Sequence, residues 1–353
     1  MINFSRPRFV TCIRSLAASI LGIALLTSST VANAIVIDWA TIGDAGNAAD
    51  LNGVGGVGYE YRISKHEVTN AQYVEFLNAV ATSDPYALYN SNMGSDTVGG
   101  ITRSGSPGSY TYSVKTTAAG QGPGGTDYAY ANKPVVYVSW YDTIRFANWL
   151  TSGATESGTY TITGGGPNAG SVTVPDHSTF AAGSETFFLP SEDEWYKAAY
   201  YGSSVSTFYG WPTGFPGTDP NNNLPSADTG ESANFLDSGY TTGDSSYPLT
   251  DVGAYGLSAS DYGTFDQGGN VWEWNEKEIV SPFGNIRGLR GGSWSSGKSS
   301  LEAFSPIDAD AATETNDYGF RVAGSAESAV PEPSTYALAA IGLLGLLAYR
   351  RFR

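Results

Sequence analysis

Three stretches of the chain begin with polar residues suited to a helix N-terminus and continue with apolar residues at helical spacing. The first starts at residues 69–72, the second at residues 139–142 and the third at residues 190–194. In the first, Thr69 followed three residues later by Gln72 matches a capping box. Three short helices are therefore predicted, with apolar faces formed by Tyr73, Phe76, Leu77 and Val80, by Phe146, Trp149 and Leu150, and by Trp195, Ala198 and Ala199.

Each predicted helix follows a short β-like run, at Tyr59–Ile63, Val135–Val138 and Thr186–Leu189 respectively. Between these units lie long stretches rich in Gly, Ser, Thr and Asn, over roughly residues 84–133, 152–185 and 202–250. With 44 glycines and 23 tyrosines in the chain, we expect a loop-rich fold held together by aromatic packing. Structureless loops of this length are unusual in a compact domain, and bound metal ions are one way to order them.

The first 34 residues have the three parts of a secretory signal peptide. Three arginines form a basic start, Leu16–Leu26 is an uncharged apolar run, and Ala32-Asn33-Ala34 provides the small residues of a signal-peptidase site. Residues 1–34 are therefore predicted to be removed after Ala34 during export. A single domain is predicted over residues 35–325, because no repeat of solenoid type divides it.

The C-terminal end has a comparable signal in reverse order. Residues 326–334 form a tether containing Pro331-Glu332-Pro333, and a charge-free run to Tyr349 precedes a cluster of arginines. At about 1.5 Å per residue, this run reaches the lower limit for a membrane-spanning helix, predicted within residues 335–353. The arginines are expected to stay in the cytoplasm.

This tail resembles the PEP-CTERM sorting signal of Gram-negative bacteria, which combines a PEP motif, a short membrane helix and a basic end. The resemblance implies export with a transient inner-membrane anchor, followed by processing near the motif by an exosortase. It also implies display at the cell surface or in the extracellular matrix, where such proteins are associated with exopolysaccharide.

The charge of the remaining chain narrows the possible partners. Six of the 18 basic residues lie in the two end segments, which leaves 12 basic against 34 acidic residues and a net charge of −22 over residues 35–349. This excess of acidic residues argues against nucleic acid as a partner, and it leaves carboxylates available to bind divalent cations. The only cysteine is Cys12, so removal of the signal peptide would leave neither a disulfide nor a thiolate.

Six ordered sequence blocks resemble the formylglycine-generating enzyme, or sulfatase-modifying factor, family. They are YRISKHEVTNAQYVEFLNAV (61–80), PVVYVSWYDTIRFANWL (134–150), FFLPSEDEWYKAAYYG (187–202), GGNVWEW (268–274), LRGGSW (289–294) and YGFRVA (318–323). The resemblance implies an α+β, C-type-lectin-like fold, with short helices around twisted antiparallel strands, long loops and little regular structure.

The same resemblance implies two calcium sites, which use oxygen ligands that suit Ca²⁺. The first set consists of Asn234, the carbonyl of Phe235, Asp244 and the carbonyl of Ser246. The second set consists of Asp266, the carbonyls of Gly269 and Val271, and Glu273. A second interpretation of GGNVWEW is a tight turn that buries Trp272 and Trp274 while Glu273 caps backbone amides.

The chain departs from the family at the catalytic cysteines, whose positions correspond to Ser296 and Leu301. Neither residue binds copper as a thiolate or forms a disulfide, so no catalytic residue and no copper are expected. Another branch of the family uses a histidine-rich iron site, but the mature chain would retain only His66 and His177, far apart in sequence. His66 is predicted to be a surface or capping residue. A serine hydrolase is disfavoured because the GxSxG elbow and a placed base are missing.

The leading hypothesis is an exported, non-catalytic member of the family that binds a ligand such as exopolysaccharide. The predicted binding residues are Trp294, Ser295, Ser296 and Lys298, because aromatic rings and hydroxyls suit sugars. Alternatively, Trp294 packs in the core and the serines only solvate a loop. The alternative functions are a divergent sulfatase-modifying enzyme and a passive structural protein of a biofilm matrix. Signal peptidase and exosortase are the partners expected during export.

Overall fold

The computed structural model describes residues 1, 35–213, 218–282 and 284–327. The chain divides into Met1–Ile35 and Val36–Arg353, and the elements below belong to the second unit. Three predicted features lie outside the described residues. They are the signal peptide with its cleavage site at Ala34, the PEP motif of Pro331, Glu332 and Pro333, and the C-terminal helix. No helix within the described ranges is long and apolar enough to cross a membrane.

The three predicted helices are present as α1 (Asn70–Val80), α3 (Trp140–Ser152) and α4 (Glu192–Tyr200). Each begins with a complete capping box, in which the side chain of the N-cap residue accepts a hydrogen bond from the third helical amide. The N-cap residues are Thr69, Ser139 and Ser191. Such caps typically stabilise a helix by about 1 kcal/mol, which helps short helices persist between long loops.

Two four-stranded sheets organise the domain. The first has the order β1-β2-β14-β7, with all pairs antiparallel, and comprises β1 (Trp39–Ile42), β2 (Tyr61–Ser64), β14 (Ala323–Ser325) and β7 (Phe187–Phe188). The second has the order β12-β11-β10-β13 and comprises β12 (Ile307–Asp310), β11 (Gly284–Arg290), β10 (Trp272–Ser281) and β13 (Tyr318–Gly319). Only the β10–β13 pair of this sheet is parallel.

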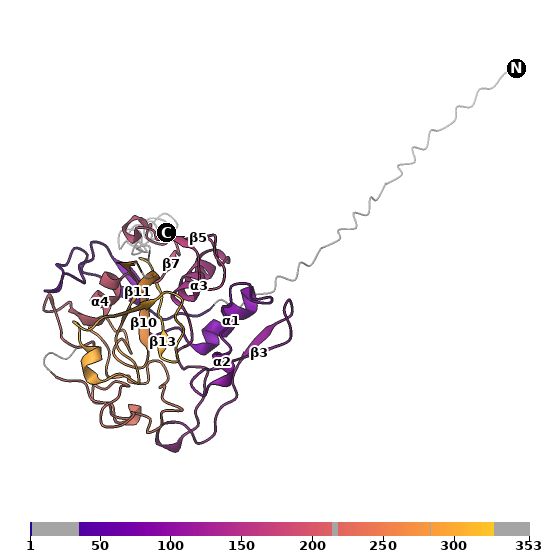
Figure 1. Cartoon of the computed structure of the whole chain (residues 1–353). Helices are drawn as coiled ribbons and strands as arrows, with labels where there is room; N and C mark the ends of the chain where they lie inside the picture. The colour runs from indigo at the N-terminus through magenta and orange to yellow at the C-terminus, as the bar shows by residue number, and fades with distance from the viewer. Residues whose placement is uncertain (2–34, 214–217, 283, 328–353) are drawn as a thin grey trace. The chain divides into compact units, whose positions relative to one another are not determined.

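The loops predicted from the polar stretches contain further short elements (Figure 1). Three two-stranded hairpins pair β3 (Ile101–Ser104) with β4 (Thr111–Val114), β5 (Thr161–Thr163) with β6 (Ser171–Thr173), and β8 (Tyr201–Gly202) with β9 (Thr207–Phe208). The short helices are α2 (Asn92–Ser95), η1 (Pro123–Gly125), η2 (His177–Thr179), η3 (Pro225–Ala227) and η4 (Lys298–Leu301). The fold is thus α+β, with short helices, mostly antiparallel strands, long loops and little regular structure, as predicted.

One predicted strand is wrong. Residues 135–138 carry a β-like sequence, but the segment is not a strand because Tyr137 has a φ of 62°. This left-handed conformation interrupts an extended chain. The segment is nevertheless buried, so its apolar sequence reflects packing in the core instead of sheet pairing.

Aromatic side chains form the core, as the composition predicted. The rings of Tyr73 and Phe76 lie 5.3 Å apart between centroids, and Phe146 contacts Phe320 at 5.4 Å. Trp274 is fully buried at the start of β10, and its indole N–H donates to the carbonyl of Val138 at 3.0 Å. Buried indoles with satisfied N–H groups fix how the helices pack on the second sheet.

Candidate functional site

The turn at Gly268–Val271 leads into β10 and places Glu273 in the interior. The Glu273 carboxylate accepts hydrogen bonds from Arg321 Nε at 2.6 Å and from Arg321 Nη2 at 2.7 Å. The indole N–H of Trp195 donates to the same carboxylate at 2.7 Å. The two charged side chains are 1% and 0% exposed, so this is a deeply buried, two-point ion pair.

Arg321 follows β13 and connects three other parts of the domain. Besides Glu273, its guanidinium donates to the carbonyls of Ser64 at 3.0 Å, Lys65 at 3.1 Å and Phe265 at 2.8 Å. All five N–H donors of the guanidinium therefore have acceptors. This side chain holds the end of β2, the loop before β10 and β10 itself in one arrangement.

Two further carboxylates lie near this ion pair. Glu67 is buried, and one of its oxygens accepts from Asn270 Nδ2 at 3.0 Å, whereas Oε2 has no hydrogen-bond partner. Burial, together with the charges of Asp266 and Glu273, raises the pKa of Glu67 well above its usual range. Burial also raises the pKa of Asp266 to about 6, and its Oδ2 accepts from Gly253 N at 2.5 Å. Three acidic groups thus lie around one guanidinium, and only Glu273 is hydrogen-bonded to it, which leaves a deficit of positive charge.

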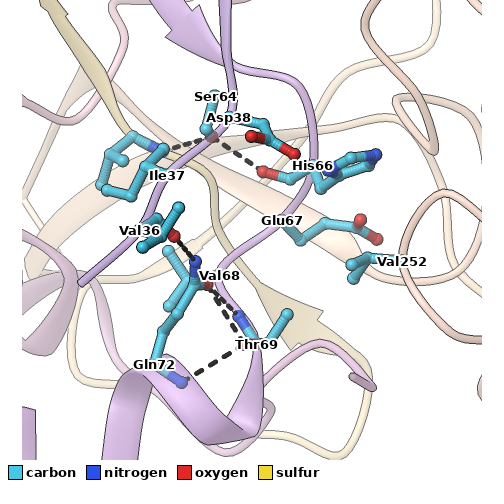
Figure 2. Close-up of a pocket in the computed structure, with 11 residues that line it drawn as sticks. Val36, Ile37, Asp38, Ser64, His66, Glu67, Val68, Thr69, Gln72 and Val252 are labelled. Carbon is cyan, nitrogen blue, oxygen red and sulfur yellow. Dashed lines mark hydrogen bonds between the residues drawn. The ribbon is translucent and has the colours of Figure 1, made fainter. Parts of the chain in front are cut away.

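Figure 2 shows a cavity beside this cluster, lined by the segment between β2 and α1 and by Val36–Asp38. The His66 ring stacks on Phe265 with centroids 5.3 Å apart, and burial followed by the charge of Arg321 lowers the pKa of His66 to about 4. His66 is therefore neutral at pH 7. Its side chain is half-buried, and the N-cap of α1 is Thr69 instead of His66. The cavity volume is about 90 Å³, which suits a few water molecules but no organic ligand.

The residues of the first predicted calcium set come from two neighbouring segments. Asn234 Nδ2 donates to the carbonyl of Pro248 at 2.9 Å, and the carbonyl of Phe235 accepts from Thr241 Oγ1 at 3.3 Å. Asp244 Oδ1 accepts from the amide of Ser246 at 2.7 Å. The structure thus brings residues 234–235 and 241–248 together around one loop.

The two predicted calcium sets also adjoin each other. Asn234 Nδ2 donates to Asn270 Oδ1 at 3.1 Å, and Asn270 stands between Gly269 and Val271, whose carbonyls belong to the second set. The side-chain and carbonyl oxygens of both sets are hard ligands that suit Ca²⁺. The unpartnered oxygen of Glu67 and the deficit of positive charge also fit a cation in this region.

Two observations limit the part that carboxylates take in such sites. Glu273 already accepts three hydrogen bonds, so Asp266 is the carboxylate of the second set with more capacity left. Across residues 35–213, 218–282 and 284–327, no group of three or more His, Cys, Asp or Glu side chains is arranged to hold a metal ion. A calcium ion here would therefore depend on amide and carbonyl oxygens, and its binding stays a prediction.

Trp294, Ser295, Ser296 and Lys298 were predicted to bind a ligand, and the two serines join a hydroxyl cluster around Ser293. Ser293 Oγ lies 3.1 Å from Ser295 Oγ and 3.0 Å from Ser296 Oγ, and donates to Asp317 at 2.9 Å. Asp317 was not predicted from the sequence, because no motif connects it with the serines. The cluster offers hydroxyls and one carboxylate, Asp317, which accepts hydrogen bonds from both Ser293 Oγ and Ser295 Oγ.

Trp294 and Lys298 are both engaged with neighbouring side chains. Trp294 is 7% exposed and packs against Tyr240 with ring centroids 5.8 Å apart. The Lys298 side chain is 42% exposed, and its Nζ lies 2.6 Å from Asp219 Oδ2. Their predicted role in ligand binding stays a prediction.

Leu301 is fully buried and packs with Ala233 and Phe235 in an apolar cluster. Trp211 packs against the same cluster. The position that the resemblance aligns with a catalytic cysteine is thus occupied by a buried apolar side chain that packs in this cluster.

Sequence reasoning missed a second buried charge network, centred on His177. Its Nδ1 lies 3.0 Å from Glu194 Oε2, and its Nε2 lies 3.2 Å from Glu276 Oε1. Burial alone would lower the pKa of His177, but the two carboxylates outweigh it and raise the pKa to about 10. His177 is thus an imidazolium at pH 7, and it joins α4 to β10. Only its isolated position in a polar stretch is visible in the sequence.

The family comparisons agree with this geometry. The family profile described as sulfatase-modifying factor enzyme 1-like domain matches residues 57–326, and the PEP-CTERM protein-sorting motif matches residues 329–351. A search of curated proteins finds no match.

Several solved structures are similar to this chain. The crystal structure of CarF has 19% sequence identity and a TM-score of 0.51, covering 83% of this chain and 99% of its own. Variable protein 1 of Treponema denticola has 19% identity and a TM-score of 0.46, covering 81% and 94%. PvdO from Pseudomonas aeruginosa has 15% identity and a TM-score of 0.41, covering 82% and 92%. At these identities, the likeness to CarF supports the fold alone.

The PEP-CTERM motif marks the chain for export and surface sorting in bacteria, with processing by an exosortase. The profile match spans most of the chain, and the fold agrees with it. The chain therefore belongs to the family of sulfatase-modifying factor enzyme 1-like domains.

Proposed function

We propose that this exported protein does not oxidise cysteine and instead binds a polysaccharide or another matrix component at the cell surface. The observation that supports it is the pair of residues at the catalytic cysteine positions. Ser296 belongs to a hydroxyl cluster, and Leu301 is fully buried among apolar side chains. The only cysteine of the chain is Cys12, within the predicted signal peptide.

A thiol-based oxidation needs thiolates that bind the metal and exchange electrons through sulfur. A serine hydroxyl is a weaker ligand that stays protonated, and leucine has no ligand atom. The proposal therefore assigns no copper and no catalytic residue to this chain. Export and surface sorting would bring the domain to the cell surface, where polysaccharides and other matrix components are available for binding.

The proposal includes Ca²⁺ as a structural ion in the two predicted sets. The hard oxygens of Asn234, Asp244 and Asp266 support it, as does the excess of buried carboxylates around Arg321. A bound cation would hold the loop at residues 241–248 against Asn234. We also propose a Gram-negative source and a transient inner-membrane anchor within residues 335–353.

A binding experiment separates a ligand-binding protein from a passive matrix component. Purified full-length protein is titrated with a panel of soluble bacterial polysaccharides, in Ca²⁺ and again in EDTA, and heat release is followed by calorimetry. The proposal predicts saturable binding to at least one polysaccharide of the panel. Absence of saturable binding throughout the panel would contradict it.

A further inference from the structure

An open groove lies away from the serine cluster, between residues 48–51, the β8–β9 hairpin with residues 209–210, and Phe304. Its volume is about 410 Å³, which falls within the range of small-molecule sites. None of its lining residues belongs to the predicted ligand-binding or calcium sets.

Aromatic and aliphatic side chains line this groove, and two of them are largely exposed to solvent. Phe304 is 54% exposed and Leu51 is 96% exposed, and Phe304 is the only exposed phenylalanine in the part of the chain that the structure describes. Tyr201, Phe208 and Tyr209 complete the lining from the hairpin side. Leaving such rings in water has a free-energy cost that a flat, partly apolar ligand would offset.

The polar groups of the groove determine which ligand fits. Asp50 lies in the wall, where its Oδ2 accepts from Tyr196 OH at 2.6 Å and its Oδ1 accepts from the amide of Leu51 at 2.7 Å. These bonds orient the carboxylate, and each oxygen keeps a free lone pair. The exposed hydroxyl residues Ser206 and Thr207 lie opposite on the hairpin.

The groove contains no positive charge, because its lining includes neither lysine, arginine nor histidine. An anionic ligand would therefore meet the Asp50 carboxylate with no opposing cation, on a chain whose net charge is −16. Hydroxyl groups of an uncharged sugar, in contrast, donate favourably to a carboxylate. Charge thus favours a neutral ligand rich in hydroxyls.

The floor of the groove is rigid. The Phe208 ring packs on Tyr196 at 5.3 Å and on Tyr201 at 5.0 Å between centroids. A Cβ atom at Gly55 would lie 2.7 Å from this ring, so a glycine is required beneath it. The amide of Ala303 donates to the carbonyl of Gly210 at 3.1 Å, which ties the Phe304 segment to the hairpin. Prior ordering of these walls lowers the entropic cost of binding.

We propose that this groove binds an uncharged hexopyranosyl polysaccharide, with Phe304 and Tyr209 against the apolar sugar faces and Asp50 accepting hydrogen bonds from sugar hydroxyls. This inference rests on the proposed function, because it assigns a site and a ligand class to the binding proposed there. It differs from the earlier expectation, which placed the ligand at Trp294 and Ser296.

The test compares full-length wild-type protein with Phe304→Ala and Asp50→Asn by calorimetry, using neutral glucans, mannans and galactans and, separately, a polyuronate. Val280→Ala is the matched control, because Val280 is 97% exposed and lies on β10, outside the groove. Removing a central aromatic contact is expected to weaken binding roughly tenfold, whereas the control keeps wild-type affinity. Unchanged melting temperatures establish that the variants are folded.

Saturable binding of a neutral polysaccharide that is weakened roughly tenfold in Phe304→Ala and also weakened in Asp50→Asn supports the inference. Wild-type affinity in both groove variants would overturn the inference but not the proposed function, and a further Ser295→Ala variant would then locate the ligand at the serine cluster. Equal affinity for the polyuronate would also overturn it, since charge selects the ligand. Absence of binding by the wild type would overturn both proposals.

Discussion

Glu273→Gln tests whether the buried ion pair with Arg321 holds the domain together. The change removes the charge of a side chain that accepts from Arg321 at 2.6 and 2.7 Å and from Trp195 at 2.7 Å. Arg321 is 0% exposed and would keep its charge, but its hydrogen-bond partners would then be backbone carbonyls and a neutral amide, with no carboxylate among them. Leaving a buried charge without its partner costs about 3–5 kcal/mol.

This free energy converts into a large change in melting temperature. At roughly 2–4 °C per kcal/mol for a domain of comparable size, the melting temperature should fall by about 10 °C. Glu278→Gln is the matched control on the same strand, because Glu278 is 63% exposed and lies 3.7 Å from Arg287. Only Arg287 of this pair is buried, and a contact as long as 3.7 Å to an exposed carboxylate contributes about 1 kcal/mol or less. The control is therefore expected to melt within a few degrees of wild type.

The assay is thermal unfolding by circular dichroism, in Ca²⁺ and in EDTA. Because Arg321 is the direct partner of Glu273, the decrease caused by Glu273→Gln should persist in EDTA. Equal melting temperatures for Glu273→Gln and Glu278→Gln would refute the reasoning. A decrease that disappears in EDTA would also refute it, because Glu273 would then act through a bound cation.

Three further predictions concern the remaining buried features. The pKa of His177 is raised from 6.5 to about 10, so its contribution to stability is complete below pH 6.5 and is lost as pH rises towards 10. Between these pH values the melting temperature should therefore decline less steeply in His177→Gln than in wild type. Parallel curves for the two proteins would contradict the charged state of His177. Leu301→Ala should cost about 2–5 kcal/mol in chemical denaturation because it empties a fully buried position, whereas a loss below 1 kcal/mol would argue against this packing. Ca²⁺ should raise the melting temperature of wild type over that in EDTA, and Asp266→Asn should reduce this increase; no response in wild type would contradict the calcium proposal.

Local sequence signals predicted the helices well. The polar starts at Thr69, Ser139 and Ser191 became complete capping boxes, because this interaction involves only four consecutive residues. The strand expected at residues 135–138 failed for a physical reason, since a positive φ at Tyr137 leaves no trace in a β-like sequence. The pairing of β10 with β13 was equally hidden, because it joins segments distant in sequence.

For the candidate sites too, single positions could be predicted from the sequence, whereas contacts between segments distant in sequence could not. The absence of cysteine at Ser296 and Leu301, which the resemblance aligns with catalytic cysteines, was visible in the sequence, and the structure adds that Leu301 is buried. Arg321 and Asp317 were missed because their partners come from other parts of the chain. The groove at Phe304 was missed for the same reason, as three separate segments form its walls.

The central claim is that this family member has no cysteine-oxidising activity. The most direct test incubates the full-length protein with a cysteine-containing sulfatase peptide, copper and oxygen, and follows the peptide by mass spectrometry. We expect the peptide's thiol side chain to remain unconverted, because Ser296 and Leu301 supply no sulfur ligand. Repeated, enzyme-dependent conversion of that side chain to an aldehyde would contradict the account.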